Sequence, residues 1–235
     1  MIALILQARL DSSRLPNKAL LPLGGRAVLL RVMEALKNVS ADRHILACPS
    51  ECVREFSPFA EEVHFDVFGG SKDDVLARYC SAIKHFHADY CIRATGDNPF
   101  VFADAASSLC AEALYRKADY AGYGSLPYGA GVEFVAAEAL LRAGREAVAP
   151  YDHEHVCPYL YGRPETFALH RPLAPPEWQG SAMRVTIDTP EDLDRAQKLY
   201  AALAEKTAFG EISRGTVIIA AYRALFADSI AAAVS

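Results

Sequence analysis

The chain has 235 residues, of which 52% are hydrophobic and 23% are charged. These values are ordinary for a globular protein, and they exclude both a disordered chain and a collagen-like fibre. The formal net charge of -5 argues against a nucleic-acid groove binder, because such proteins cluster lysine and arginine against the phosphates. At this length we expect one main domain with a full hydrophobic core.

The start of the chain carries the most informative pattern. An apolar strand over residues 2–7 runs into the sequence QARLDSSRLPNK, whose cations are Arg9, Arg14 and Lys18. Ligands of open α/β sheets collect beyond the carboxyl ends of strands, and these cationic groups bind phosphate oxygens. Neither GxxxxGKS/T nor GxGxxG follows the strand, which argues against a P-loop kinase and a nicotinamide dehydrogenase. The loop therefore predicts a polyphosphate site, with a solvated basic loop as the alternative.

Hydrophobic periodicity predicts strands that alternate with helices along the chain. The expected strands cover residues 2–7, 43–48, 63–67, 88–93, 119–122, 131–135, 166–171 and 184–187. The expected helices cover residues 26–38, 72–86, 103–116, 136–144, 151–162 and 190–206. Ser71 is the expected N-cap of the second of these helices. The alternation predicts an α/β fold with a mostly parallel sheet covered on both faces.

Two segments depart from this alternation. Residues 120–131 contain four glycines and a proline, so we expect a mobile loop that either covers a substrate or merely connects two strands. Residues 207–235 carry an apolar helical pattern that ends in alanines. We expect residues 1–207 to form the main domain and residues 208–235 to form a helical tail that packs on it or on a partner subunit.

Two aspartates directly follow predicted strands. Asp97 stands in RATGDNP and Asp188 in VTIDTP. Mg²⁺ is normally held by one or two carboxylates together with phosphate oxygens and water. Beside a cationic loop, this pair predicts a metal site for a triphosphate. The alternative for each aspartate is a turn former or a helix cap.

Six blocks of sequence together carry a resemblance to a known family. They are QARLDSSRLPNKALLPLGG, FGGSKDDVLARY, IRATGDNPF, GVEF, DHEHVCPYLY and RVTIDTPEDL, in order over residues 1–205. The chain resembles the SpsF-like cytidylyltransferases, which are related to the CMP-sugar synthetases for 3-deoxy-manno-octulosonate and neuraminate. The resemblance implies a three-layer, Rossmann-like, GT-A-type nucleotidyltransferase fold over residues 1–207, with CTP as the donor and Mg²⁺ as the ion.

The resemblance also implies a role for each matching position. The CTP-binding loop of the family matches Ala8, Arg9, Ser12, Ser13, Arg14 and Lys18. The metal aspartates match Asp97 and Asp188, and contacts to the base or phosphates match Arg78 and Arg93. The acceptor is expected near Glu133, His153 and His155.

The acceptor region departs from the CMP-sugar synthetases. The sequence GYGSLPYGAGVEF is shorter than their acceptor-binding region, which leaves the acceptor open. His153 and His155 stand two apart, so in a helix they point to different sides and do not grip one ion. One of them could contact an anionic acceptor or act as a general base near neutral pH. A surface or capping histidine is the alternative for either.

The expected reaction is attack by an acceptor oxygen on the α-phosphorus of CTP, with release of pyrophosphate. Lys18 and Arg14 would stabilise the leaving group. The acceptor would be an anionic, sugar-like or phosphate-bearing molecule used in surface polysaccharide or glycoconjugate synthesis. A GT-A glycosyltransferase is one alternative, although a DxD motif at the end of a strand is missing. A non-catalytic nucleotide-binding module is another, although Lys18, Asp97 and Asp188 are all present.

The remaining expectations concern thiols and location. The six cysteines form no CxxC pair, so we expect buried free thiols. The N-terminal strand lacks the basic flank and cleavage site of a signal peptide, and no apolar run reaches the roughly eighteen residues of a membrane span. We therefore expect a cytoplasmic enzyme that binds a nucleoside triphosphate and a small-molecule acceptor, without nucleic-acid or membrane partners. The tail leaves a homodimer open.

Overall fold

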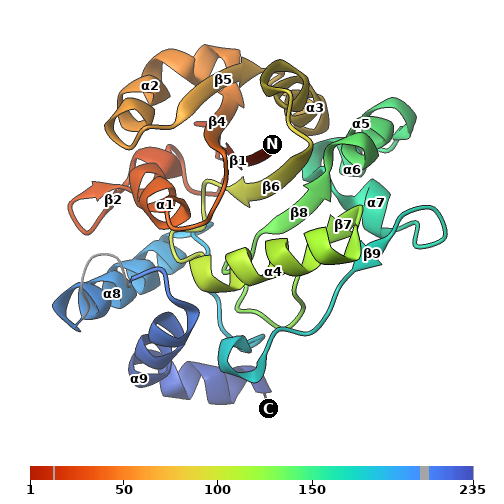
Figure 1. Cartoon of the computed structure of the whole chain (residues 1–235). Coiled ribbons are helices and arrows are strands. Elements are labelled where there is room, and N and C mark those ends of the chain that lie inside the picture. Colours follow the sequence, from red (N-terminus) through yellow and green to blue (C-terminus); the bar gives the residue numbers. More distant parts are fainter. Residues whose placement is uncertain (13, 207–211, 235) are drawn as a thin grey trace.

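The computed structural model describes residues 1–12, 14–206 and 212–234. Ser13 and the expected boundary between residues 207 and 208 lie outside the described residues. Within them, one sheet has seven strands in the order β5-β4-β1-β6-β8-β7-β9 (Figure 1). These strands are β1 (Ile2–Gln7), β4 (Arg43–Pro49), β5 (Asp66–Gly70), β6 (Tyr90–Thr95), β7 (Tyr120–Ala121), β8 (Glu133–Ala136) and β9 (Leu169–His170). A separate antiparallel pair joins β2 (Pro22–Leu23) to β3 (Arg26–Ala27).

The sheet is mostly parallel, as the sequence predicts. β1 pairs in parallel with β4 and β6, and β4 pairs in parallel with β5. β8 runs antiparallel to both β6 and β7. Residues 3–6 of β1 are fully buried, which explains why this strand is continuously apolar rather than alternating. Gln7 pairs with Ala47 and Thr95, so the carboxyl ends of β4, β1 and β6 open at one edge of the sheet.

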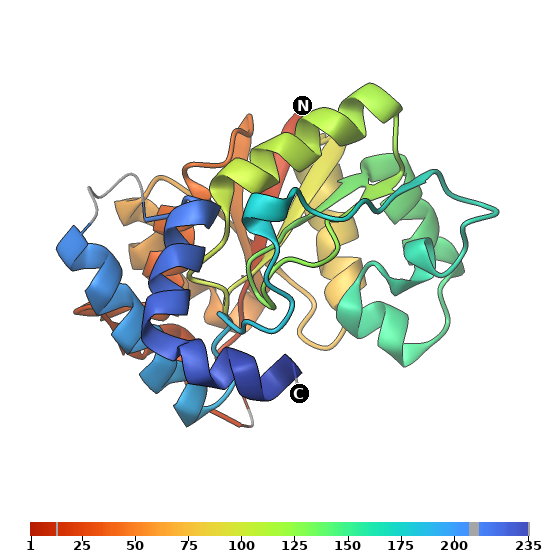
Figure 2. The same ribbon diagram turned by 90° about the horizontal axis from the view of Figure 1, so that it is seen from below.

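Helices cover both faces of the sheet (Figures 1 and 2). They are α1 (Val28–Leu36), α2 (Val53–Glu62), α3 (Val75–Phe86), α4 (Ala103–Arg116), α5 (Ala137–Glu146), α6 (Pro150–His155), α7 (Pro158–Tyr161), α8 (Pro190–Lys206) and α9 (Gly215–Val234). Short 3₁₀ turns are η1 (Lys18–Leu20), η2 (Ser50–Cys52) and η3 (Pro176–Trp178). The described helices and the sheet form the expected three-layer α/β architecture.

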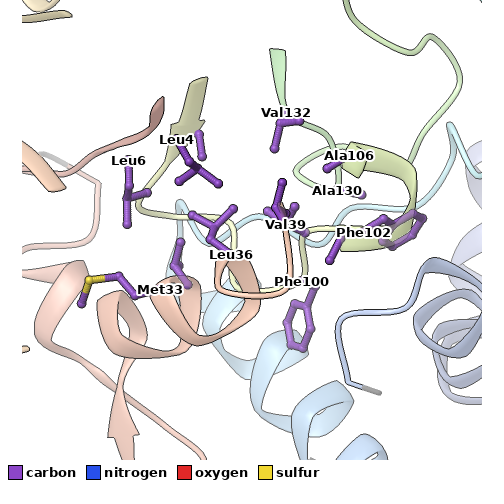
Figure 3. Packing of buried hydrophobic residues seen from close by; sticks show 14 of the residues in the cluster. Leu4, Leu6, Met33, Leu36, Val39, Phe100, Phe102, Ala106, Ala130 and Val132 are labelled. Atoms are coloured by element: carbon purple, nitrogen blue, oxygen red, sulfur yellow. The ribbon is translucent and has the colours of Figure 1, made fainter. Parts of the chain in front are cut away.

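Alternation along β1 divides the buried side chains into two clusters. Leu4 and Leu6 pack with Met33 and Leu36 of α1 on one face, as Figure 3 shows. The intervening Ala3 and Ile5 lie in the cluster that α3 and α5 cover on the other face. This follows from the period of two along a strand. The six cysteines are buried and free, as expected.

Several local predictions were wrong. Residues 184–187 are not a strand of the seven-stranded sheet. An isolated β-bridge between Tyr128 and Arg184 joins this segment to the loop before β8 instead. The predicted helix over residues 151–162 is two helices, broken at Val156, whose φ is 74°. The N-cap of α3 is Asp74 and not Ser71, since Asp74 Oδ1 accepts the Ala77 N–H at 2.8 Å. Ser71 Oγ instead accepts the Asp74 N–H. Helix α2 was not predicted.

The C-terminal helix α9 packs against α8 and α4 (Figure 2). Ile218, Ile219 and Tyr222 are buried in this contact region. The carboxylate of Asp104, in the first turn of α4, accepts the Gly215 N–H at 3.0 Å. Among the described residues, no helix is both long enough and apolar enough to cross a membrane.

Candidate active site

A cavity of about 560 Å³ lies at the edge of the sheet where β1 and β6 end. Its lining contains most of the site residues that the sequence suggests. Before β6 in the chain, these are Ala8, Arg9, Ser12, Arg14, Lys18 and Arg78. The others are Arg93, Asp97, Glu133, His155 and Asp188. The fold therefore gathers residues that lie far apart in the sequence.

The centre of the cavity is a cluster of Lys18, Asp97 and Asp188. Lys18 Nζ donates to Asp97 Oδ2 and Asp188 Oδ1, each at 2.9 Å, and to the Ile187 carbonyl at 3.1 Å. Burial lowers the pKa of the Lys18 ammonium, but the two carboxylates outweigh this and raise it. The ammonium is therefore held in its charged form between the two acids.

Backbone contacts explain why these two aspartates meet. The Gly96 N–H donates to the Gln7 carbonyl at 2.8 Å, and a Cβ on Gly96 would lie 2.9 Å from Ala8 Cβ. Glycine thus lets the end of β6 approach the end of β1. The Asp97 carbonyl accepts the Ile187 N–H at 2.9 Å, which ties the turn after β6 to the segment before Asp188.

Asp188 is surrounded by cations. Arg184 Nη2 donates to Asp188 Oδ2 at 2.8 Å, and Arg14 Nη2 lies 3.5 Å from Asp188 Oδ1. Burial raises the pKa of Asp188, but Lys18, Arg14 and Arg184 together lower it below its usual value. The carboxylate is therefore ionised at neutral pH.

Sequence reasoning missed Asp192, which holds this arrangement in place. Its carboxylate, only 4% exposed, accepts from Arg184 Nε at 2.9 Å and from the Asp188 N–H at 3.0 Å. Asp192 and Thr189 also exchange side-chain to backbone hydrogen bonds, which is the capping-box arrangement at the start of α8. The sequence TPED carries the signal for this cap, because Thr and Asp stand three apart at a predicted helix start.

The donor set of Asp97 and Asp188 fits Mg²⁺. Two carboxylates that converge on one cationic group can converge on a metal ion, with phosphate oxygens and water as further ligands. Within the described residues, no group of three or more His, Cys, Asp or Glu side chains could hold a metal. A metal held by this pair would take its other ligands from the nucleotide and from water.

The basic loop leaves most of its charge exposed. The side chains of Arg9 and Arg14 are 52% and 65% exposed, respectively. The Ala8 N–H donates to the Ala47 carbonyl at 3.3 Å.

Arg78, by contrast, is 1% exposed, and its Nη1 donates to the Ser71 carbonyl at 2.6 Å. Burial lowers the pKa of Arg78, and its Nε has no partner among the described residues.

Arg93 and Glu133 are paired with each other. Arg93 Nη1 donates to Glu133 Oε2, and Arg93 Nη2 donates to Gln7 Oε1 at 3.3 Å. The Tyr120 hydroxyl donates to Glu133 Oε1 at 2.7 Å. The charges of Arg93 and Glu133 therefore compensate each other on the wall of the cavity.

The two histidines are in different environments. His155 lines the cavity, and its ring contacts that of Tyr151, with centroids 4.3 Å apart. His153 is not in the lining: its Nδ1 lies 2.8 Å from Asp74 Oδ2 and its Nε2 lies 3.1 Å from the Ala147 carbonyl. The hydrogen bond with Asp74 raises the pKa of His153. The structure brings His155 to the site and does not bring His153.

A second cavity of about 630 Å³ adjoins the first. The two share Arg93, Thr95, Asn98, Tyr128, Gly129 and Glu133. From this border the second cavity extends along residues 122–127 to Arg171. Sequence reasoning did not find Tyr128, Tyr151, Tyr161 or Arg171, because single aromatic or basic residues in loops and short helices carry no periodic signal.

Comparisons with known proteins give matches in both sequence and fold. A family model described as cytidylyltransferase matches residues 3–214. The chain is 30% identical over 216 residues to the spore coat polysaccharide biosynthesis protein SpsF of Bacillus subtilis (strain 168), covering 87% of this chain and 88% of that protein.

Solved structures show the same fold. A cytidylyltransferase from Leptospira borgpetersenii serovar Hardjo-bovis (strain JB197) superposes with a TM-score of 0.85 at 24% identity, covering 97% of this chain and 96% of that one. A CMP:2-keto-3-deoxy-manno-octonic acid synthetase complexed with CTP gives a TM-score of 0.64 at 14% identity, covering 87% and 99%. The family match spans the N-terminal strand, the Lys18 cluster and the start of α8. The chain therefore belongs to the cytidylyltransferase family, and it is a nucleotidyltransferase.

Proposed function

We propose that the protein transfers CMP from CTP to an anionic, sugar-like or phosphate-bearing acceptor and releases pyrophosphate. The observation that carries this proposal is the contact of Lys18 with both Asp97 and Asp188 in a cavity that also holds Arg9 and Arg14. Such a site combines carboxylates for a divalent cation with cations for a polyphosphate. The B. subtilis relative is named for spore coat polysaccharide biosynthesis, and this supports a precursor of a surface polysaccharide as the product.

Asp97 and Asp188 would hold Mg²⁺, which when bound would neutralise negative charge on the transferred phosphoryl group. Arg184 and Asp192 keep the Asp188 carboxylate in position, and Arg14 reaches it from the basic loop. Lys18 would stabilise the negative charge of the departing pyrophosphate. Because phosphoryl transfer is catalysed mainly by positioning and charge neutralisation, no covalent intermediate on the protein is required.

The chemical step is a single displacement. A bond forms between an acceptor oxygen and the α-phosphorus of CTP, while the bond from that phosphorus to the bridging oxygen breaks and pyrophosphate leaves with the electron pair. An acceptor hydroxyl must lose its proton in this step. His155 lines the cavity, and histidine is the side chain that most often serves as a general base.

Melting temperatures with each of the four nucleoside triphosphates and Mg²⁺ test the nucleotide half of the proposal. A ligand that binds the native state stabilises it by mass action, so CTP should give the largest increase. Pyrophosphate release then tests the reaction. A nucleotide-sugar-dependent glycosyltransferase would release a nucleotide from a nucleotide-sugar and would leave CTP intact. Equal stabilisation by all four triphosphates, or by none, would contradict the proposal.

A further inference from the structure

The two adjoining cavities differ in the charges that line them. The Lys18 cluster and the basic residues Arg9 and Arg14 line the first cavity and are absent from the described lining of the second. The border between them includes Thr95 and Asn98, on either side of Gly96 and Asp97 in the chain. A molecule in the second cavity would therefore meet a phosphate chain in the first cavity beside Asp97.

The wall of the second cavity is fixed by backbone hydrogen bonds. The Gly122 and Gly124 N–H groups donate to the carbonyls of His170 and Pro172, at 3.1 and 2.8 Å. At the other end of the loop, the Tyr128 N–H donates to the Met183 carbonyl at 2.9 Å. Residues 120–131, which the sequence predicts to be a mobile loop, are thus held at both ends by backbone hydrogen bonds. They form a preorganised wall of the pocket.

Gly129 holds this wall against the segment that leads to Asp188. Its φ is +94°, and a Cβ at this position would lie 2.6 Å from the Thr186 backbone nitrogen. Any other residue would strain the backbone and push the two segments apart. The second cavity is therefore built together with the metal-binding turn.

Arg171 is directed to this cavity by strand alternation. His170, the last residue of β9, lies on the α4 side, where its Nε2 is 2.8 Å from Glu112 Oε2. The following side chain points to the opposite face, and Arg171 lines the second cavity with its guanidinium 5.2 Å from the centre of the Tyr161 ring. Tyr161 belongs to the lining of the first cavity, so Arg171 stands near the junction of the two.

The charge balance of the second cavity is positive by one. Among the charged residues of its lining, Arg93 and Glu133 form an ion pair with each other. Arg171 has no ion pair within the described ranges 1–12, 14–206 and 212–234. The rest of the lining offers hydroxyl, amide and peptide groups, including Asn98, whose Oδ1 is buried without a hydrogen-bond partner in that part of the chain.

We propose that the second cavity binds the acceptor and that Arg171 binds its one anionic group, a carboxylate or a phosphate. This inference rests on the proposed cytidylyl transfer. The uncharged polar lining binds the hydroxyl groups of a sugar-like body, and the attacking oxygen reaches the α-phosphate at the border beside Asp97. Arg171 can form two parallel hydrogen bonds with either anion, so it recognises the chemistry that carboxylate and phosphate share.

The experiment measures pyrophosphate release from CTP and Mg²⁺ with a panel of sugar acids and sugar monophosphates, each paired with its uncharged parent sugar. Anionic members should react and their parents should not, and the two anion classes reveal which group Arg171 binds. With the best anionic member, Arg171→Ala should raise KM by about 10- to 100-fold, the loss expected for hydrogen bonds to a charged group. Arg171→Lys should recover part of this loss, because it restores the charge without the planar fork.

Arg163→Ala is the matched control. Arg163 also stacks on a tyrosine, with its guanidinium 3.7 Å from the Tyr159 ring centre, but it lines neither cavity. This variant should keep the KM of the unmodified protein. Arg171→Ala should also keep the increase in melting temperature that CTP and Mg²⁺ produce, which shows that it is folded and binds nucleotide.

These readouts separate the two proposals. If CTP and Mg²⁺ do not stabilise the unmodified protein, the proposed function fails. If CTP still stabilises it but neutral sugars react as well as anionic ones, or no anionic member reacts, the inference about the acceptor is overturned. An unchanged KM in Arg171→Ala likewise overturns it.

Discussion

The carboxylate of Asp192 accepts a hydrogen bond from the backbone N–H of Asp188 at 3.0 Å. The same carboxylate holds Arg184, which in turn donates to Asp188 Oδ2. A residue outside the lining of the first cavity thus fixes both the backbone and the side chain of an expected metal ligand. Such supporting contacts commonly change metal affinity when they are removed.

Asp192→Asn should therefore raise the Mg²⁺ concentration required for half-maximal activity by about 10- to 100-fold. The physical reason is that a neutral amide binds Arg184 more weakly and frees the Asp188 side chain. Pyrophosphate release measured against Mg²⁺ concentration tests this. Asp194→Asn is the control, because Asp194 lies on the same helix but is 63% exposed and pairs with Lys198. An unchanged Mg²⁺ requirement in Asp192→Asn would remove its positioning role.

Asp97→Asn and Asp188→Asn should each reduce turnover by orders of magnitude, because a lost metal contact removes transition-state stabilisation. Both variants should still fold, as judged by their circular dichroism spectra. Asp66→Asn serves as the control, since Asp66 begins β5 and pairs with Arg43 rather than with Lys18. Near-normal turnover in either cavity variant would contradict the metal assignment.

Asp192 should also contribute to stability in a defined pH range. Its burial raises its pKa, but hydrogen bonds from Arg184 and the Asp188 backbone dominate and lower it to about 2, from 3.8. A carboxyl group whose pKa is lower in the folded state stabilises that state at pH values above its unfolded pKa. This stabilisation is lost as the pH falls through the folded pKa. As the pH falls from 4 to 2, the loss of this stabilisation should lower the free energy of unfolding by about 2 kcal/mol. Denaturant unfolding should show a smaller fall for Asp192→Asn.

Gly129→Ala should be more damaging than Gly25→Ala. Both glycines have positive φ, of +94° and +78°, so each substitution carries the cost of that backbone conformation, about 1 kcal/mol. A Cβ on Gly129 also overlaps Thr186, whereas one on Gly25 meets nothing within 4 Å. Thermal unfolding should show the larger loss for Gly129→Ala, together with lower activity. Equal losses would mean that the close approach to Thr186 is unimportant.

The two histidines should respond differently to substitution. His155→Gln should lower kcat by about 100-fold if its imidazole accepts the acceptor proton, whereas His153→Gln should leave kcat unchanged. The hydrogen bond with Asp74 raises the pKa of His153. This hydrogen bond therefore stabilises the folded state fully below the unfolded pKa of His153, and the stabilisation is lost as the pH rises through the folded pKa. Comparison of kcat for the two variants, with melting temperatures at pH 5.5 and 8.5, tests both statements. A lower kcat in His153→Gln would reverse the assignment.

The sequence by itself predicted the α/β architecture and most of the residues that line the candidate active site. The apolar residues 2–6 indicate a strand buried on both faces. The cations that follow this strand, Arg9, Arg14 and Lys18, line the cavity at the carboxyl ends of β1 and β6. Asp97 and Asp188 could be identified because each directly follows an apolar extended segment and precedes a turn or a helix. These signals are local, because burial and turn formation impose a pattern on neighbouring residues.

Only the tertiary structure decided which of these groups touch. Lys18 meets acids 79 and 170 positions away, and residues 184–187 reach them as a segment bonded to a loop rather than as a sheet strand. The structure likewise directs His153 to Asp74, pairs Arg93 with Glu133, and turns Arg171 toward the second cavity. Strand order and side-chain direction set these contacts, and hydrophobic periodicity reports only whether a segment is buried, not which distant segment lies against it.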